Sequence, residues 1–592
     1  MAGTLAAHLR GVADRESDPG AGRSLASQRK TIFAPRAPTP SQKKTWHTNS
    51  GWPQGHAGHG AGNRGAGGTR PSREGFLTVR YYDWIVHHGR RTPDKVAVID
   101  LASERRFTYS QLDARVSRLA SFLRHTLKVS RGDRVAVLAL NTTDTLEVQF
   151  ACGRLGAIFV PLNTRLTVPE LQFITGDCAP KVMIHDTDLA ETALSVAKLC
   201  NIPISLLLGP GGAYEAGIAS AKPLDRAEEV TLDDVSTIMY TSGTTGHPKG
   251  ATITHGMTFW NCVNLGGPAC IGPSSVLLTV LPLFHTGGLN CYTNPVLHAG
   301  GTVMIMRAFD PGTALGLIND PAQGINVFFG VPAIYQFMAQ HPAFATTDLT
   351  RLIVGGVGGA PMPVPLLKVW EARGVALQQG YGMTETSPAV LVLDREDAAR
   401  KAGSAGKPVL HTEVRIVRPD GSDAETGELG ELWVKGPNIT PGYWNRPEAN
   451  KTSFTDGWLH TGDATRVDED GFYYIVDRWK DMYISGGENV YPAEVENVLH
   501  QLAAIAEAAV IGIPDAQWGE VGLAIVAAKT GQRLTETDVL AHCAANLARF
   551  KCPRQVRFVE ALPRNATGKI HKPTLRKDFS VVSEVDKKVA NA

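Results

Sequence analysis

Alternating helix-like and strand-like segments constrain the fold of this chain more than any other feature. Residues 108–126 place apolar side chains at helical spacing, and residues 134–140 are an apolar run after a Gly-Asp turn. Residues 153–163 pass from a helical to a strand-like pattern, and short apolar runs follow at 182–185 and 204–208. Because helix-like segments are repeatedly followed by buried-strand patterns, the alternation predicts stacked parallel α/β units.

The pattern changes at about residue 475, where a second and smaller unit begins. Amphipathic and strand-like segments occur there at 495–502, 506–515, 523–530 and 538–550. The charged stretch 477–481 lies between two apolar runs and is typical of a domain join. We therefore expect an α/β protein with a large domain of stacked αβ subdomains at 78–479 and a small α+β domain at 480–592.

The first 77 residues differ from the rest in composition. They hold eight Arg and three Lys against four acidic residues, a net charge of +7, so the other 515 residues carry −5. With eleven large apolar side chains, and eight glycines within 51–68, this segment cannot bury enough surface to offset its ordering entropy. We expect a disordered extension. A dispensable segment or an upstream start codon is the favoured explanation, and organellar targeting or a binding role stay open.

Charge and apolar patterning exclude several classes of function. The 515 residues after the extension carry a net negative charge, which gives no electrostatic case for nucleic-acid binding. No apolar run reaches the roughly 18–20 residues of a membrane-spanning helix. No two of the eight cysteines lie within four residues of each other, so the sequence has no short-spaced metal knuckle or CxxC redox motif. Scattered cysteines in a long chain fit a reducing compartment.

The strongest motif is the segment YTSGTTGHPKG at 240–250. Its glycines expose backbone N–H groups, its hydroxyls donate hydrogen bonds and Lys249 neutralises charge, which suits a mobile loop around phosphates. It is not a Walker A loop, because the spacing between its glycines and lysine differs from that pattern. A flexible surface linker is the weaker interpretation, because so long an ordered string does not recur by chance.

Four weaker segments become informative as a set. The segment QGYGMTET at 379–386 offers an aromatic face to a nucleobase and a carboxylate to Mg²⁺, although alone it is typical of a tight turn. Asp463, in a Thr-Gly-Asp triplet, suits ribose hydroxyls, although such an Asp is usually a turn residue. Taken alone, residues 477–488 indicate a charged linker followed by a glycine turn. Taken alone, residues 563–570 indicate a solvated loop. His285, after an apolar run, is as well explained by a structural role.

Together and in this order, these segments resemble the adenylate-forming superfamily of acyl-CoA synthetases, luciferases and peptide-synthetase adenylation domains. The resemblance covers about residues 79–576. It implies a large AMP-binding domain and a mobile C-terminal domain that moves about a hinge at Lys480 between two half-reactions. It also implies ATP, Mg²⁺ and CoA, with Thr241 and Glu385 holding the metal ion.

The resemblance assigns three further sets of residues. Those for ATP and AMP are Thr241, Ser242, Gly243, Thr244, Thr245, Gly246, Lys249, Gly359, Ala360, Pro361, Gln379, Gly380, Tyr381, Gly382, Thr384, Asp463 and Arg478. Those for the acyl group and CoA are His285, Thr286, Gly287, Gly288, Gly358, Gly486 and Gly487. The catalytic set is Lys569, His285 and Lys480, in which Lys569 matches the lysine that reaches the carboxylate and the α-phosphate.

The implied reaction has two steps. The substrate carboxylate attacks the α-phosphate of ATP to form an acyl-adenylate and pyrophosphate, and a thiol then attacks the acyl carbonyl and expels AMP. Catalysis is then mostly positioning and charge stabilisation. A stand-alone acid–CoA ligase, a carrier-loading adenylation domain and a nucleotide-binding protein without chemistry compete. The ligase is favoured, because the expected polar groups are present and no fused carrier module follows. A free-standing enzyme that loads a separate carrier protein stays open.

The sequence defines the carboxylic acid substrate less closely than it defines the reaction. No carboxylate occurs at 276–300, where amino-acid-activating relatives place an aspartate, so an uncharged tail is favoured. Small residues at 355–360 leave space for a chain or a ring, and the overall pattern favours a medium- or long-chain fatty acid. No Trp occurs at 261–369, where some long-chain members carry a gate, so an aryl acid of the cinnamate or coumarate type stays open. We expect cytoplasmic work on small molecules, with a homodimer left open.

Overall fold

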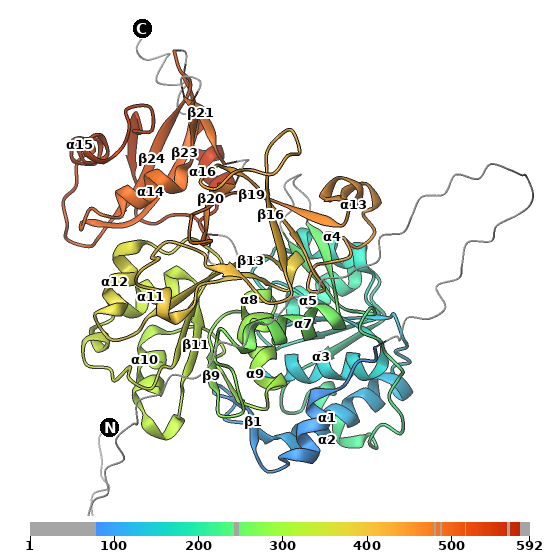
Figure 1. Cartoon of the computed structure of the whole chain (residues 1–592). Helices are drawn as coiled ribbons and strands as arrows, with labels where there is room; N and C mark the ends of the chain where they lie inside the picture. Colours follow the sequence, from blue (N-terminus) through green and yellow to red (C-terminus); the bar gives the residue numbers. More distant parts are fainter. Residues whose placement is uncertain are drawn as a thin grey trace, which may run out of the picture. The chain divides into compact units, whose positions relative to one another are not determined.

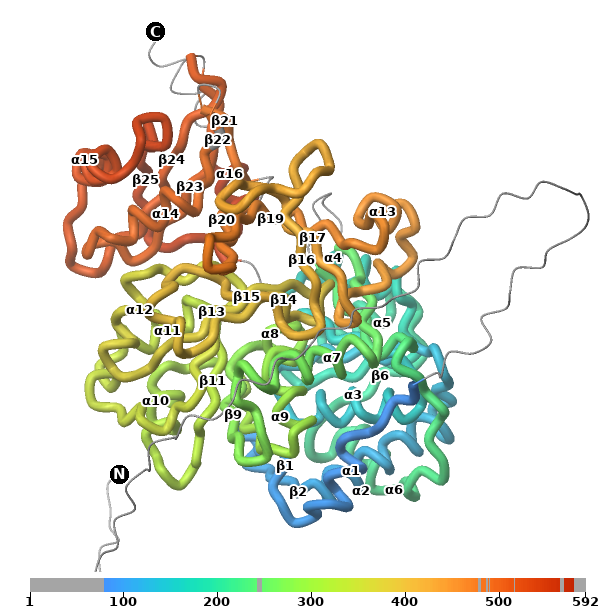
Figure 2. Tube along the Cα trace, in the orientation of Figure 1, coloured from blue at the N-terminus to red at the C-terminus, as the bar shows by residue number. Residues whose placement is uncertain are grey.

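The computed structural model describes residues 79–241, 248–478, 481–485, 488–515, 517–564 and 569–580, apart from the side chains of Arg478, Asn489 and Ser580. Figures 1 and 2 label its helices and strands in chain order.

The first α/β layer is a sheet with the order β6-β5-β3-β4-β7-β8. Its strands are β3 (Arg134–Leu138), β4 (Ile158–Pro161), β5 (Val182–His185), β6 (Ile204–Leu207), β7 (Val235–Thr241) and β8 (Lys249–Thr254). The helices between them are α3 (Thr143–Leu155), α4 (Val168–Cys178), α5 (Ala190–Leu199) and α6 (Ala213–Ser220). All strand pairs except the β7–β8 hairpin are parallel, which confirms the predicted parallel α/β pattern.

A second sheet has the order β15-β14-β13-β12-β11-β9-β10-β1-β2 and is parallel from β13 to β1. Its strands are β1 (Val96–Asp100), β2 (Arg106–Thr108), β9 (Val276–Thr279), β10 (Thr302–Ile305), β11 (Val327–Gly330), β12 (Val354–Val357), β13 (Leu377–Gly382), β14 (Ala389–Val392) and β15 (Lys407–Pro408). Its helices are α1 (Trp84–Arg91), α2 (Tyr109–Ser121), α7 (His255–Gly266), α8 (Thr286–Gly288), α9 (Asn294–His298), α10 (Pro311–Asn319), α11 (Pro332–Gln340) and α12 (Val364–Glu371). A π-helix, η2 (Leu289–Thr293), joins α8 to α9.

Two smaller sheets complete the described part. One contains β16 (Glu413–Val417), β17 (Gly430–Lys435), β18 (Phe454–Thr455), β19 (Trp458–Val467) and β20 (Tyr473–Arg478), with α13 (Pro447–Ser453) beside it. The other contains β21 (Tyr483–Ser485), β22 (Glu488–Val490), β23 (Ile505–Asp515), β24 (Gly519–Ala528) and β25 (Gln555–Phe558). It packs with α14 (Pro492–Leu499), α15 (Glu536–Asn546) and α16 (Lys572–Ser580), drawn in orange and red in Figure 2. The mixed helix and strand pattern predicted after residue 475 is confirmed.

Local sequence signals explain where the helices begin and end. At the start of α2, Thr108 and Gln111 form a capping box, and Leu112 and Leu119 are fully buried on one face of the helix. Helix α3 ends at Gly156, whose φ of 63° is left-handed and therefore suits glycine. The helix predicted at 108–126 is α2 followed by one π-helical turn at Phe122–Thr126.

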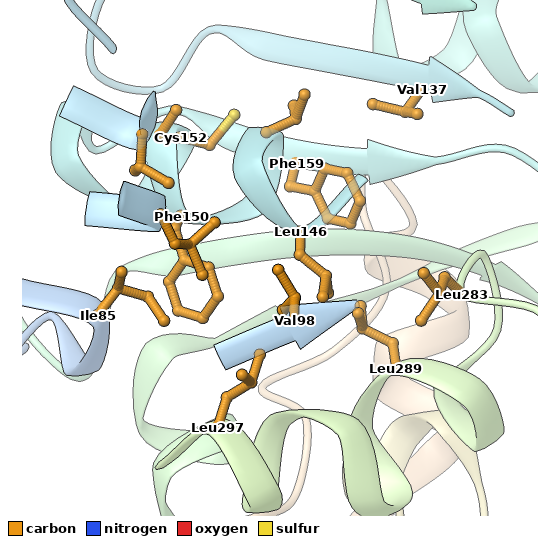
Figure 3. Close-up of a cluster of buried hydrophobic side chains, with 14 of the residues drawn as sticks. Ile85, Val98, Val137, Leu146, Phe150, Cys152, Phe159, Leu283, Leu289 and Leu297 are labelled. Atoms are coloured by element: carbon orange, nitrogen blue, oxygen red, sulfur yellow. The ribbon is translucent and has the colours of Figure 1, made fainter. Parts of the chain in front are cut away.

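The largest hydrophobic core lies between the two α/β sheets. In Figure 3, Leu146 and Phe150 of α3 have Phe159 of β4 on one side and Val98 of β1 on the other. Because α3 is buried along most of its length, it supports both sheets. No helix among the described residues is long and apolar enough to cross a membrane.

Candidate active site

The β7–β8 hairpin holds both ends of the phosphate-loop motif. Thr241 ends β7 and pairs with Lys249, which begins β8, and the Thr241 hydroxyl donates to the Lys249 carbonyl at 3.4 Å. The Tyr240 hydroxyl donates to the Asp177 carboxylate of α4 at 2.7 Å, which anchors the end of the strand. The loop between them includes Ser242, Gly243, Thr244, Thr245 and Gly246, which lie outside the described residues.

Tyr443 connects the lysine of this motif with the carboxylate of the second motif. The ammonium nitrogen of Lys249 lies 5.2 Å from the centre of the Tyr443 ring, and the Tyr443 hydroxyl donates to Glu385 Oε1 at 2.9 Å. Glu385 is buried in a short 3₁₀ turn with Thr384, and its carbonyl accepts from the Thr440 amide at 2.7 Å. A cation and a carboxylate therefore lie around one aromatic ring at the mouth of the loop.

Strands β12 and β13 bring the two glycine-containing segments together. They are parallel neighbours, and a Cβ on Gly358 would stand 3.1 Å from the carbonyl of Gly380. A Cβ on Gly382 would stand 1.7 Å from the carbonyl of Pro388, so only glycine fits there. The segment QGYG is therefore the end of β13, and the second half of the motif, Thr384–Thr386, forms a 3₁₀ turn. Gly359, Ala360 and Pro361 directly follow β12.

Asp463 lies beside this edge. It is buried within β19, and its carboxylate accepts a hydrogen bond from the Tyr381 hydroxyl of β13. The turn expected for Asp463 alone is therefore wrong. Arg478 of β20 pairs with Asp463 along the backbone. The side-chain amide of Gln379 donates to the carbonyl of Ser404 at 3.1 Å.

Glu431 is a residue of this region that the sequence analysis did not find. Gly462 has a left-handed φ of 71°, and its N–H donates to Glu431 Oε1 at 2.8 Å. The indole N–H of Trp433 donates to the other oxygen, Oε2, at 2.9 Å. The carboxylate therefore holds the glycine that directly precedes Asp463. No local signal marks Glu431, because the contact joins β17 to β19.

Lys569 and His285 lie close together, although they are far apart in the sequence. The Cε atom of Lys569 is 3.6 Å from the place that a Cβ on Gly359 would take. Burial, and secondarily the Lys569 charge, lowers the pKa of His285 to about 3, so its imidazole is neutral. Nδ1 of His285 accepts from the Gly287 amide at 3.1 Å. Burial raises the pKa of the Cys291 thiol to about 12, and Lys569 opposes that shift.

A small cavity lies between α8, η2 and the second sheet. Gly287, Gly288, Tyr292, Thr293 and Phe329 line it, together with β9. Thr286 is buried beside it. The Tyr292 and Phe329 ring centres are 5.0 Å apart, and both rings cover Gly356 of β12. Aromatic rings therefore fill the space over Gly356.

The described residues provide some, but not all, of the ligands that a metal ion needs. Among them, no group of three or more His, Cys, Asp and Glu could hold a metal ion without other ligands. The carboxylate of Glu385 and the hydroxyl of Thr241 are hard oxygen donors, which suit Mg²⁺ with phosphate and water completing the shell. Lys480, Gly486, Gly487 and the extension at 1–77 lie outside the described residues, as does the side chain of Arg478.

These features define a class of protein. Residues 85–444 match the family model of the AMP-binding enzymes, and residues 494–569 match that of the AMP-binding enzyme C-terminal domain. The chain therefore belongs to the adenylate-forming AMP-binding enzymes, and it is an acid–thiol ligase of the AMP-forming kind.

The alignments with individual relatives span nearly the whole length of each relative. A feruloyl-CoA synthase from Amycolatopsis sp is 45% identical over 498 residues, which are 84% of this chain and 98% of that protein. A long-chain-fatty-acid–CoA ligase from Mycobacterium tuberculosis is 39% identical over 491 residues, 83% of this chain and 96% of that one. The crystal structure of ATP-bound MatB from Rhodopseudomonas palustris has a TM-score of 0.79 at 33% identity, covering 84% and 99% of the two chains.

Proposed function

We propose that this acid–CoA ligase acts on an aryl acid of the cinnamate or coumarate type rather than on a medium- or long-chain fatty acid. The observation that carries the proposal is the far wall of the acyl cavity, where Tyr292 and Phe329 cover Gly356. A flat ring packs well against aromatic side chains, whereas an extended chain needs the space beyond them, which Tyr292 and Phe329 fill. The 45% identity to a feruloyl-CoA synthase supports the same choice.

We propose the following division of roles. Lys249 and the loop before it bind the phosphates of ATP, Thr241 and Glu385 hold Mg²⁺, and Asp463 binds the ribose. Lys569 neutralises charge between the substrate carboxylate and the α-phosphate while the acyl-adenylate forms. The neutral imidazole of His285 stands beside that lysine without repelling a cation.

In the second half-reaction, the C-terminal domain (480–592) rotates on the large domain (78–479) about Lys480, and CoA reaches the acyl-adenylate past Gly486 and Gly487. One geometry cannot present both Lys569 and a thiol to the same carbonyl. We further propose that the enzyme works in the cytoplasm on small molecules, as a monomer or a homodimer.

The choice of acid is tested by a substrate panel. Purified enzyme with ATP, Mg²⁺ and CoA is assayed for pyrophosphate release and thioester formation with C4–C18 fatty acids, cinnamate, 4-hydroxycinnamate and benzoate. We expect kcat/KM for the cinnamates to exceed that for each fatty acid by about tenfold or more. Tyr292→Ala should open the far wall and raise kcat/KM for C10–C14 acids. Wild-type kcat/KM values for fatty acids equal to those for cinnamates would reject the aryl-acid proposal.

A further inference from the structure

Gln336 of helix α11 makes a hydrogen bond to a strand of the C-terminal region. Helix α11 buries Tyr335 and Met338 in the core beside the second sheet, whereas Gln336 is only half-buried. Its side-chain amide donates to the backbone carbonyl of Ala506, near the start of β23, at 2.7 Å. Gln336 belongs to the large domain (78–479) and Ala506 to the C-terminal domain (480–592). A rotation of one domain on the other therefore breaks this hydrogen bond.

A β-bulge presents the Ala506 carbonyl to helix α11. In the pairing of β23 with β24, Ile505 lies opposite Ala528 and Glu507 lies opposite Ala527, so Ala506 is an extra residue with no opposite partner. A bulge takes its extra residue out of the regular ladder and changes the direction of its polar groups. The acceptor that the ladder leaves over is therefore the one to which α11 donates.

The residue after this bulge holds the loop that carries Lys569. One oxygen of the Glu507 carboxylate accepts from the Leu562 amide at 3.1 Å, and the other pairs with the Arg564 guanidinium. Arg564 in turn forms an antiparallel bridge with Ile570, which directly follows Lys569. The base of the loop is therefore fixed to the bulge that α11 contacts.

The helix and the lysine meet the same part of the large domain. Helix α11 lies between β11 and β12 in the chain, and Gly359 follows β12. The Cε atom of Lys569 is 3.6 Å from the place that a Cβ on Gly359 would take. A C-terminal domain docked at α11 therefore carries Lys569 to Gly359, and a domain released from α11 is able to turn away.

We propose that Gln336 is a positioning residue, which docks the C-terminal domain through the Ala506 carbonyl and so favours the arrangement in which Lys569 acts. This inference rests on the two half-reactions of the proposed function, but not on the choice of acid. A contact that exists in one arrangement only shifts the equilibrium between the two by its own free energy. Its loss slows adenylation, speeds thioester formation or does both, so the ratio of the two rates falls in each case.

The test measures this ratio in Gln336→Glu. Glutamate has nearly the same shape as glutamine, but its carboxylate cannot donate to the Ala506 carbonyl. We expect the single-turnover rate of acyl-adenylate formation, divided by that of thioester formation from supplied acyl-adenylate and CoA, to fall about fivefold or more. The acid is 4-hydroxycinnamate, or dodecanoate if the substrate panel rejects the cinnamates. Gln336→Met, which is neutral and also lacks a donor, should give the same result.

Gln340→Glu is the matched control variant. It makes the same change of charge and shape at the exposed last residue of the same helix. We expect it to keep the wild-type ratio and the wild-type Tm. An equal fall of the ratio in Gln340→Glu would show that any added charge on α11 has this effect, and it would overturn the role of Gln336.

The remaining outcomes separate this inference from the proposed function. If Lys569→Ala slows both half-reactions equally, the proposed alternation fails and the inference fails with it. If Lys569→Ala slows adenylation alone while both Gln336 variants keep the wild-type ratio, only the inference fails. Equal losses of both rates in the Gln336 variants leave the ratio unchanged and overturn the inference as well.

Discussion

Individual residues in this protein owe their chemistry to neighbours that are distant in the sequence. His285 is neutral because it is buried and because Lys569 lies nearby. Tyr443 lies between Lys249 and Glu385, and it limits where each of these charged groups can point. The proposed chemistry therefore depends on a few placed charges rather than on the net charge of the chain.

Lys569→Ala should separate the two half-reactions. The ammonium group beside Gly359 is proposed to neutralise charge only during adenylation, so its loss should lower acyl-adenylate formation by about 100-fold or more. Thioester formation from supplied acyl-adenylate and CoA should stay near the wild-type rate. Single-turnover measurements of each half-reaction check this, and equal losses in both would contradict the role given to Lys569.

His255→Phe should make stability less dependent on pH. His255 lies 4.2 Å from the Tyr81 ring, its Nε2 is buried without a partner among the described residues, and burial lowers its pKa to about 4. Between pH 6.5 and 4 the unfolded chain therefore binds more protons, so stability falls as pH falls through that window. His255 alone costs about 2 kcal/mol between pH 6.5 and 5.

Buried Glu147 acts in the opposite direction, because burial raises its pKa to about 7 and its carboxyl gains a proton as pH falls. The informative quantity is therefore the difference between variant and wild type. Urea unfolding at pH 7 and pH 5 should show a smaller loss of unfolding free energy for His255→Phe. Equal losses would mean that His255 titrates normally in the folded protein.

At the scale of elements, the ends of strands position the site. The β7–β8 hairpin holds the two ends of the proposed phosphate loop, β12 and β13 align two glycine segments, and β17 holds Gly462, the residue before Asp463. In each case the backbone pairing of two strands fixes where a side chain or an amide points.

Glu431→Gln should weaken ATP binding specifically. A glutamine has one acceptor oxygen, so it cannot accept from both the Gly462 amide and the Trp433 indole. Losing one such hydrogen bond, worth about 1 kcal/mol, should raise KM for ATP about fivefold and leave KM for the acid unchanged. The double variant with Trp433→Phe removes the competing donor and should restore KM for ATP. Equal rises in both KM values, without rescue, would indicate a purely structural role.

At the scale of the whole molecule, the two family models match residues 85–444 and residues 494–569. The +7 extension at 1–77 precedes all of the residues that we propose for the site. In the rest of the chain, only a few cationic side chains have proposed roles, and they lie on different strands or loops.

Deleting residues 1–77 should therefore leave kcat and KM for ATP, acid and CoA unchanged. No residue of that segment belongs to the matched region or to the proposed site. Steady-state kinetics of the full chain and of the shortened chain check this, with thermal unfolding as the control for folding. A large loss of turnover at unchanged Tm would show that the extension contributes to catalysis.

Local patterns in the sequence were sufficient for the elements and the family. The strands at 134–138, 158–161 and 182–185 follow from short apolar runs, because hydrophobic periodicity is a local property. The motif around Lys249 is also a local pattern, and it predicts a phosphate loop. Tyr381 and Asp463 lie in strands rather than in isolated turns, because the strands that pair with theirs are distant in the sequence and leave no local signal.

The sequence by itself therefore determined the class of enzyme, its nucleotide chemistry and most of its secondary structure. Only the tertiary structure decided that Glu431 holds Gly462 beside Asp463, that Lys569 lies near His285, and that Tyr292 and Phe329 close the space over Gly356. The physical reason is that a sequence motif contains the groups that contact a ligand common to the whole family. The size and polarity of the acyl cavity arise instead from packing between β9, η2, β11 and β12, which no local pattern records.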